Sequence, residues 1–173
     1  MLEEEKGKVK QSPEHASMWE RMESWLEAEG ITFEAVSDFN SHYHIAVNMK
    51  NVQVHLSEPK VRRGVLAVQA VMVLDDQQVW KARQIKKEAL RSIFLALFKM
   101  LDSSEYHFML QEDFFSKSWL RIQRTLYIEE LTRTGLLREM KELNLKFVTL
   151  TYSLNEALDN APKSGSSEET IYT

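Results

Sequence analysis

The sequence predicts an α+β domain in which helices pack on an antiparallel sheet of five to six strands, in the order α-β-β-β(-β)-α-β-β-α. Three observations lead to this class. Apolar residues recur every three or four positions in three segments, which is typical of amphipathic helices. Between these segments apolar and polar residues alternate, which is typical of strands. The chain has 173 residues, 43% of them hydrophobic, and this suits one core.

The composition of the two ends sets the limits of the predicted domain. Residues 1–11 are mostly Glu and Lys without apolar periodicity, and residues 159–173 contain Pro162, Gly165 and three serines. Such segments cannot bury enough apolar surface to fold. We therefore expect a single domain over residues 12–158 and a disordered tail at each end.

The first helix is expected between Ser12 and Gly30. Ser12 can cap it, Pro13 suits its first turn, and Gly30 supplies a left-handed stop. Its apolar residues form one stripe: Met18, Trp19, Met22, Trp25 and Leu26. The alternation over residues 31–35 then predicts a short strand.

A β-hairpin is predicted over residues 41–57. Its apolar residues fall on one face of each strand: Tyr43, Ile45 and Val47, then Val52, Val54 and Leu56. A two-residue turn and a four-residue loop both give opposed pairs whose numbers sum to 99. This register places Val47 opposite Val52 and His44 opposite His55.

The middle of the chain is the most apolar part. Residues 65–74 contain Gln69 as their one polar member, so this strand is expected to be covered on both faces, by helices or by another subunit. One helix is predicted from Val79 to Leu101. Its stripe comprises Val79, Ala82, Ile85, Ala89, Ile93, Leu97 and Met100.

A second hairpin is predicted from residues 106–110 and 120–128, joined by a loop over residues 111–117. Arg124 interrupts the apolar face of its second strand. Three explanations fit this arginine: a β-bulge, an edge position, or a paired buried charge.

The last helix is predicted from a 3.5-residue repeat. Thr132 or Thr134 can cap its start. The repeat comprises Leu136, Met140, Leu143, Phe147, Leu150, Leu154 and Ala157. Either the domain's own sheet or a second chain can fill this stripe.

The composition and the absence of known motifs argue against several classes of function. The chain has no cysteine, which excludes disulfides, thiolate catalysis and cysteine-bound metals. It carries no P-loop, Gly-rich dinucleotide turn, Ser-His-Asp spacing or HExxH motif, so no reaction and no cofactor is predicted. No apolar run approaches the roughly 20 residues of a membrane span, and we expect a cytoplasmic protein without a membrane partner.

The charge is unevenly distributed. Residues 12–58 hold eight acidic and two basic residues, and residues 60–100 hold nine basic and three acidic residues. Such opposed fields can be satisfied within one molecule, between two copies, or by an anionic partner. Arg83, Lys87 and Arg91 recur every four residues and form a predicted basic ridge that could contact phosphates or an acidic protein. Because no aromatic-interleaved basic motif accompanies it, we favour pairing within or between copies over nucleic acid.

Three of the five histidines, His42, His44 and His55, lie in the first hairpin and are the candidate metal ligands. Opposed side chains on a hairpin are close enough for two imidazoles to share a metal. No third strong ligand is evident on that face unless Glu34 or Glu58 comes within reach. The alternative is a polar sheet surface that faces solvent or a partner.

Trp119 is the best candidate for an exposed aromatic residue, because it alternates with the core positions of its strand. An exposed tryptophan marks an interface.

The element order resembles the fold of type III secretion chaperones and of a related bacterial sensory-regulator family. Over residues 13–158 the chain more closely resembles a small archaeal family of uncharacterised proteins assigned to this fold. The features that carry the resemblance are Trp19–Gly30 leading into a strand, the run His44–Val47, and Trp119–Arg121 running into Leu126–Thr132. The resemblance implies frequent homodimerisation and, in the secretion chaperones, binding of an extended segment of another protein.

The function predicted from these observations is a chaperone- or adaptor-like interaction domain. We expect it to form a homodimer and to bind itself or a segment of another protein or peptide. The alternative is a metal-binding or metal-sensing protein built on the histidine cluster.

Overall fold

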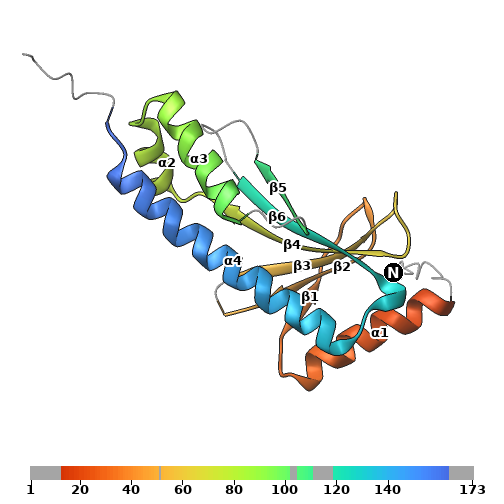
Figure 1. Ribbon diagram of the computed structural model, residues 1–173. Helices are drawn as coiled ribbons and strands as arrows, with labels where there is room; N and C mark the ends of the chain where they lie inside the picture. Colours follow the sequence, from red (N-terminus) through yellow and green to blue (C-terminus); the bar gives the residue numbers. More distant parts are fainter. Residues whose placement is uncertain (1–12, 51, 102–104, 111–118, 164–173) are drawn as a thin grey trace, which may run out of the picture.

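The computed structural model describes residues 13–50, 52–101, 105–110 and 119–163 (Figure 1). These residues form four α-helices, six strands and one 3-10 turn. In chain order they are α1 (Pro13–Ala28), β1 (Phe33–Ala35), β2 (Ser41–Asn48), β3 (Gln53–Pro59), β4 (Val65–Val73), α2 (Asp76–Arg83), α3 (Lys87–Leu101), β5 (Tyr106–Leu110), β6 (Trp119–Tyr127), η1 (Ile128–Glu130) and α4 (Arg133–Asn160).

The strands form one sheet in the order β1-β2-β3-β4-β6-β5, and every neighbouring pair is antiparallel. α4 runs along the sheet, with α1 beside its first turns and α2 and α3 beside its last turns (Figure 1). This arrangement confirms the predicted α+β class and the number of strands. The predicted loop over residues 111–117 lies outside the described residues.

The first hairpin has a different register from the predicted one. Val47 lies opposite Val54, and His44 lies opposite Ser57, so the numbers of opposed residues sum to 101. The Met49 N–H donates to the Val52 carbonyl at 3.0 Å and closes the hairpin one pair beyond Asn48 and Gln53. A slip of two residues keeps every side chain on its face, so the apolar pattern could not distinguish the two registers.

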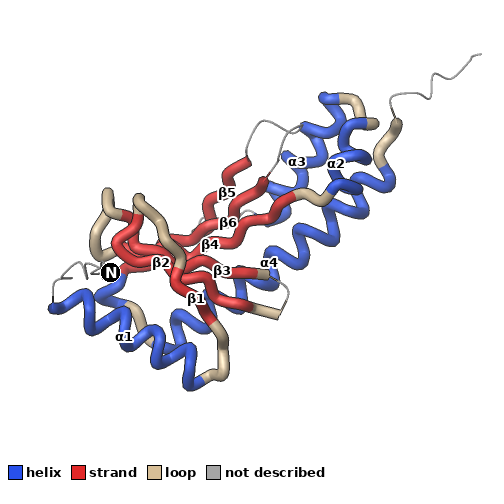
Figure 2. Tube along the Cα trace, turned by 180° about the vertical axis from the view of Figure 1, so that it is seen from behind, coloured by secondary structure: helices blue, strands red, loops and turns tan. Residues whose placement is uncertain are grey.

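β4 is covered by helices on one face. Leu66, Val68, Ala70 and Met72 are buried on the face toward α4. On the other face Val65 and Ala67 are buried, but Val73 at the strand's end is 63% exposed. No described helix crosses in front of this second face (Figure 2). Of the two coverings expected for this face, the described helices supply none, and coverage by another subunit stays a prediction.

The predicted helix over residues 79–101 is two helices. The Asp75 carboxylate accepts a hydrogen bond from the Gln78 N–H at 2.7 Å, and the Gln78 side chain accepts one from the Asp75 N–H at 3.0 Å, so a capping box begins α2. α2 ends at Arg83, and Ile85 in the connection forms a β-bridge with Lys163. The apolar period continues across the break because Ala82, Ile85 and Leu90 are all buried.

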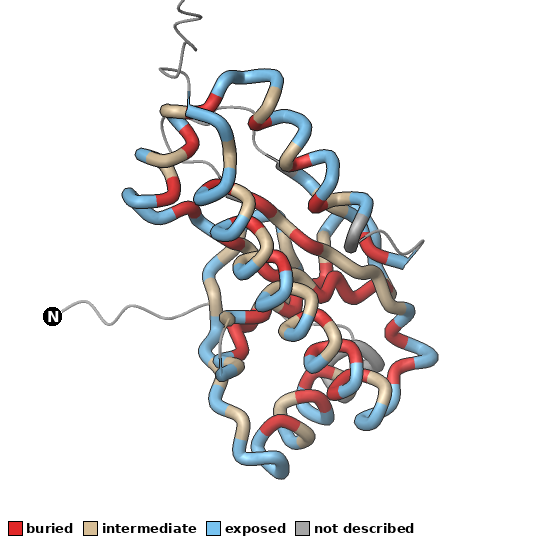
Figure 3. The backbone as a smooth tube through the Cα atoms, turned by 60° about the vertical axis from the view of Figure 1, so that its left-hand side comes forward, coloured by how far each residue is buried: buried red, intermediate tan, exposed pale blue. Residues whose placement is uncertain are grey.

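α4 supplies the largest part of the helical layer. Thr132 caps it by accepting a hydrogen bond from the Gly135 N–H at 3.1 Å. The predicted 3.5-residue stripe faces the domain's own sheet, and five of its members are buried: Leu136, Met140, Leu143, Leu150 and Leu154. Figure 3 shows buried positions alternating with exposed ones along the helices. The helix continues to Asn160, so the tail predicted from residue 159 begins too early. The predicted tail over residues 1–11 and the end of the other, residues 164–173, lie outside the described residues.

α1 closes the end of the sheet formed by β1, β2 and β3. Its Trp19 ring stacks on Tyr43 of β2 with centroids 4.0 Å apart, while Met22 and Leu26 are fully buried. Gly30 adopts a φ of 66°, the left-handed conformation that ends the helix. Among the described helices, none combines the length and the apolar content needed to cross a bilayer.

Of the three explanations for Arg124, the structure supports the paired charge. β6 lies between β4 and β5 in continuous register, which removes an edge position and a bulge. The guanidinium bonds the buried carboxylate of Glu139 on α4 and lies 3.0 Å from Glu105. The arginine therefore ties the sheet to the long helix.

Candidate interaction surface

The side of α4 that faces away from the sheet keeps large apolar side chains in contact with solvent. Leu145 is 65% exposed, Val148 37% and Tyr152 71%. They are spaced three and four residues apart, so they lie on one face of the helix, opposite the buried stripe. Exposed apolar residues that lie next to one another mark interaction surfaces more often than isolated ones do. We call Leu145, Val148 and Tyr152 the outer stripe.

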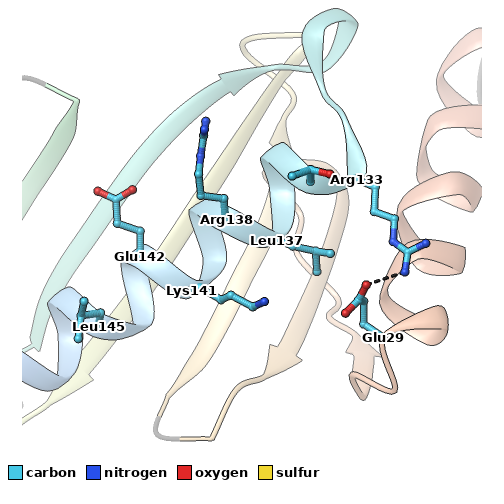
Figure 4. Close-up of a pocket in the computed structure, with 8 residues that line it drawn as sticks. Glu29, Arg133, Leu137, Arg138, Lys141, Glu142 and Leu145 are labelled. Carbon is cyan, nitrogen blue, oxygen red and sulfur yellow. Dashed lines mark hydrogen bonds and ion pairs between the residues drawn. The ribbon is translucent and has the colours of Figure 1, made fainter.

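A groove of about 780 Å³ extends this surface toward the start of α4. Leu137 and Leu145 supply its apolar lining, and the turn after α1 contributes Glu29, whose carboxylate lies 2.5 Å from the Arg133 guanidinium. The remaining lining residues are Thr134, Arg138, Lys141 and Glu142. Figure 4 shows side chains projecting from successive turns of α4, with Glu29 facing Arg133 from the end of the neighbouring helix. Such a mixture of apolar and charged groups suits a protein surface better than a small apolar ligand.

A second hollow of about 330 Å³ lies beside the later turns of α4. Its lining residues are Phe147, Val148, Thr151, Tyr152 and Asn155. Val148 and Tyr152 belong both to this hollow and to the outer stripe. The apolar surface therefore extends around the flank of the helix, where a partner side chain could insert.

The predicted histidine cluster lies on the sheet face that no described helix covers. His44 Nε2 and His55 Nδ1 are 3.0 Å apart, although the two residues are diagonal neighbours and not an opposed pair. His44 Nδ1 lies 3.4 Å from the Asp38 carboxylate, which in turn accepts a hydrogen bond from the Ser41 hydroxyl at 2.5 Å. The two imidazoles are therefore in contact, as the predicted register implied, although the observed register differs by two residues.

His42 does not join this pair. A shift in the strand pairing falls between Ser41 and Tyr43, and the His42 ring instead accepts a hydrogen bond from Arg63 Nε at 3.2 Å. The Glu58 carboxylate accepts one from the Gly64 N–H at 2.8 Å. Among the described residues, no three His, Asp or Glu side chains gather as a metal-binding group. Two histidines alone would hold a metal weakly.

The surroundings of the histidine pair shift two titrations. Burial lowers the pKa of His55, and the charges of His44 and Arg121 lower it further, against a smaller opposing effect of Glu34. The hydrogen bonds from Ser41 and from the Asn40 N–H lower the pKa of Asp38. The neutral form of His55 is therefore favoured more strongly than in a free imidazole. The arrangement provides a hydrogen bond between the two rings.

The other predicted interaction residues lie on three elements. Arg83 ends α2, whereas Lys87 and Arg91 lie one turn apart on α3, so the ridge expected on one helix spans two helices. Trp119 pairs with Val73 at the start of β6, and its side chain lies outside the described part of the chain. Trp80 on α2 is 59% exposed.

The outer stripe was missed in reading the sequence. Its signal is present, because Leu145, Val148 and Tyr152 form a second apolar series on the same helix, spaced by three and four. The stronger 3.5-residue repeat on the opposite face was sufficient to predict the helix and left these three residues unassigned. A helix that is apolar on two opposite faces has two surfaces to cover.

Solved structures share this fold. An uncharacterized protein from Methanothermobacter thermautotrophicus superposes with a TM-score of 0.73 at 15% sequence identity, covering 82% of this chain and 99% of its own. YbjN from E. coli superposes with a TM-score of 0.51 at 12% identity, covering 79% of this chain and 90% of its own. Likeness at this level of identity concerns the fold alone.

Comparison at the level of sequence identifies a family. No curated protein matches the chain at a significant level. Residues 18–152 match the family model described as "Uncharacterized conserved protein (DUF2299)", and this match spans α1 through most of α4. The chain therefore belongs to the DUF2299 family of uncharacterized conserved proteins.

Proposed function

We propose that this chain is a non-catalytic protein-interaction domain, adaptor- or chaperone-like, that binds a copy of itself or a segment of another protein. The observation that carries the proposal is the outer stripe on α4 with its adjoining groove. The helix is already anchored to its own sheet through its opposite face, so the outer stripe contributes nothing to the core. The resemblance to secretion chaperones, which stays a prediction, implies such a role.

The proposal is tested by making the outer stripe charged. In the full chain, Leu145→Asp is combined with Tyr152→Asp. The two carboxylates would have to be desolvated in an interface that covers the outer stripe. The core stays intact because both native side chains are exposed. We expect the variant to lose self-association, measured by light scattering, or the specific retention of a protein from an extract of source cells, identified by mass spectrometry.

The matched control is Leu95→Asp on α3, since Leu95 is half exposed and does not belong to the outer stripe. Circular dichroism establishes that both variants fold. Two results together would show that the interaction function is wrong. The wild type would not self-associate, and it would retain the same proteins as the double variant.

The metal-binding alternative is supported by one observation, the 3.0 Å contact between the rings of His44 and His55. Its test is equilibrium dialysis of the full chain against zinc, nickel or copper near neutral pH. Stoichiometric uptake that is lost in His44→Gln and His55→Gln would support metal binding. Uptake below stoichiometric level, or uptake that both variants retain, would remove it.

A further inference from the structure

The outer face of α4 carries a charge pattern as well as the outer stripe. Positions 138, 141, 145, 148, 152, 156 and 159 are spaced by three and four, so they line one side of the helix over about 32 Å. The first two are Arg138 and Lys141, and the last two are Glu156 and Asp159. All four are exposed, on either side of the apolar centre.

This pattern is complementary to itself when the helix is reversed. Two α4 helices that pair antiparallel about a twofold axis near Val148 bring Leu145 of one copy against Tyr152 of the other. The same alignment brings Lys141 against Glu156 and Arg138 against Asp159, and each pairing occurs twice. A parallel pairing would instead place like charges together. Only the antiparallel arrangement satisfies both the apolar centre and the charged ends.

The charge of the rest of the molecule changes in the opposite direction along α4, whose own outer face is basic at its start and acidic at its end. The acidic residues 12–58 belong to α1 and the first three strands, beside the start of α4, whereas α2 and α3 in the basic stretch lie beside its end (Figure 1). Antiparallel pairing of α4 places the acidic end of each copy beside the basic end of the other. The two uneven halves of the sequence thereby compensate each other across the dimer.

We propose that the outer face of α4 is an isologous docking surface for a second copy of this chain, with the two α4 helices antiparallel and crossing near Val148. This inference rests on the proposed interaction function and names its partner. A self-complementary order of charges is what a twofold contact requires, whereas binding of an unrelated segment does not need it. Asp159 remains 56% exposed while it bonds Lys81, so its carboxylate is accessible to the second copy.

Cysteine crosslinking tests the geometry, and the absence of native cysteine makes every crosslink attributable. Under mild oxidation of the full chain, Val148→Cys should form covalent dimers, because this position lies near the proposed axis. Leu145→Cys mixed with Tyr152→Cys should give mixed dimers at least about tenfold faster than either variant alone. Leu95→Cys on α3 is the control for random collision.

Charge reversal tests the pairing independently of geometry. Lys141→Glu or Glu156→Lys alone should weaken dimerisation about tenfold, since each creates two like-charge contacts across the axis. The combination of both changes in one chain should restore the affinity to within about threefold. Sedimentation equilibrium at two ionic strengths measures these constants, and high salt should reduce the differences between the variants.

Each contrary result overturns the inference. If the full chain stays monomeric over the accessible concentration range, a second copy is not the partner of this surface. If Leu145→Cys crosslinks to itself as fast as to Tyr152→Cys, the two helices are not antiparallel. If Val148→Cys crosslinks no faster than Leu95→Cys, the dimer uses another surface. If the chain is monomeric but Leu145→Asp with Tyr152→Asp abolishes retention of a specific protein, the inference fails while the interaction function stands.

Discussion

The ion pair between Arg124 on β6 and Glu139 on α4 joins the sheet to the helical layer. Glu139 is 3% exposed, and the Tyr106 hydroxyl also donates to it at 3.4 Å. Burial, with the nearby charge of Glu139, raises the pKa of Tyr106 to about 12, so this hydroxyl keeps its proton as a donor. Because the Glu139 carboxylate is buried, it needs a cation beside it, and Arg124 supplies that charge.

Removing one partner should cost more than removing both. Arg124→Ala leaves the Glu139 carboxylate buried without its main cation, and we expect the free energy of unfolding to fall by about 3 kcal/mol. Arg124→Met combined with Glu139→Leu should recover most of that loss, because no charge is then buried. Urea denaturation followed by tryptophan fluorescence measures both. Equal losses in the two variants would contradict the pairing.

The histidine pair predicts how stability responds to acid. The pKa of His55 is lower in the folded state than its ordinary value of about 6.5. The unfolded state therefore binds more protons below about pH 6.5, and stability that is complete above this pH is lost as pH falls through the folded pKa. Replacing His55 by Gln should flatten the pH dependence of the free energy of unfolding below about pH 6.5. An unchanged slope would show that His55 does not titrate differently on folding.

At the scale of elements, the break between α2 and α3 shows how a local signal overrides a periodic one. Apolar spacing continues from residue 79 to 101, because both helices bury their stripes against neighbouring elements. The capping box at Asp75 determines where α2 starts. The helix ends where the Gln84 and Ile85 N–H groups donate to the Lys81 and Ala82 carbonyls, at 3.0 and 3.2 Å, and Ile85 pairs with Lys163. Periodicity reports burial, whereas continuity of the backbone depends on such local bonds.

The cap is testable by one substitution. Asp75→Ala removes the side-chain acceptor of the Gln78 N–H, and we expect a loss of about 1 kcal/mol in the free energy of unfolding together with faster hydrogen exchange in α2. Asp76→Ala is the matched control, because Asp76 lies in the first turn and does not make the capping bond, so its effect should be a few tenths of a kcal/mol. If the two substitutions cost the same, the capping box does not stabilise α2.

At the scale of the whole molecule, the end of α4 and the residues beyond it hold α2 in place. Lys81 on α2 bonds Asp159 at 2.5 Å, and Ile85 pairs with Lys163. The chain therefore contributes to the fold beyond residue 158, where the predicted domain ended.

A chain that stops after Leu158 should lose this attachment. We expect faster hydrogen exchange at the amides of α2, and unchanged exchange in β2, β3 and β4, because the sheet core does not depend on these contacts. A chain that stops after Lys163 retains both contacts and should behave as the full chain does. Equal exchange in α2 of both truncated chains would contradict the attachment.

The sequence by itself determined the fold class, the element order, the faces of the strands and the inward stripe of α4. These features follow from periodicity, because a period of two or of three to four residues states which side chains are buried together. It also indicated that Arg124 needed an explanation, since a charge at a core position must be paired, exposed or displaced.

Only the tertiary structure decided the features that depend on distance between elements. The hairpin register slipped by two residues, which leaves every face unchanged and is invisible to the pattern. Contact between His44 and His55, the partner of Arg124, and the exposure of Leu145, Val148 and Tyr152 each depend on which element lies nearby. A sequence specifies what a side chain prefers to contact, but the packing of the chain determines which of those preferences is met and which surface is left for a partner.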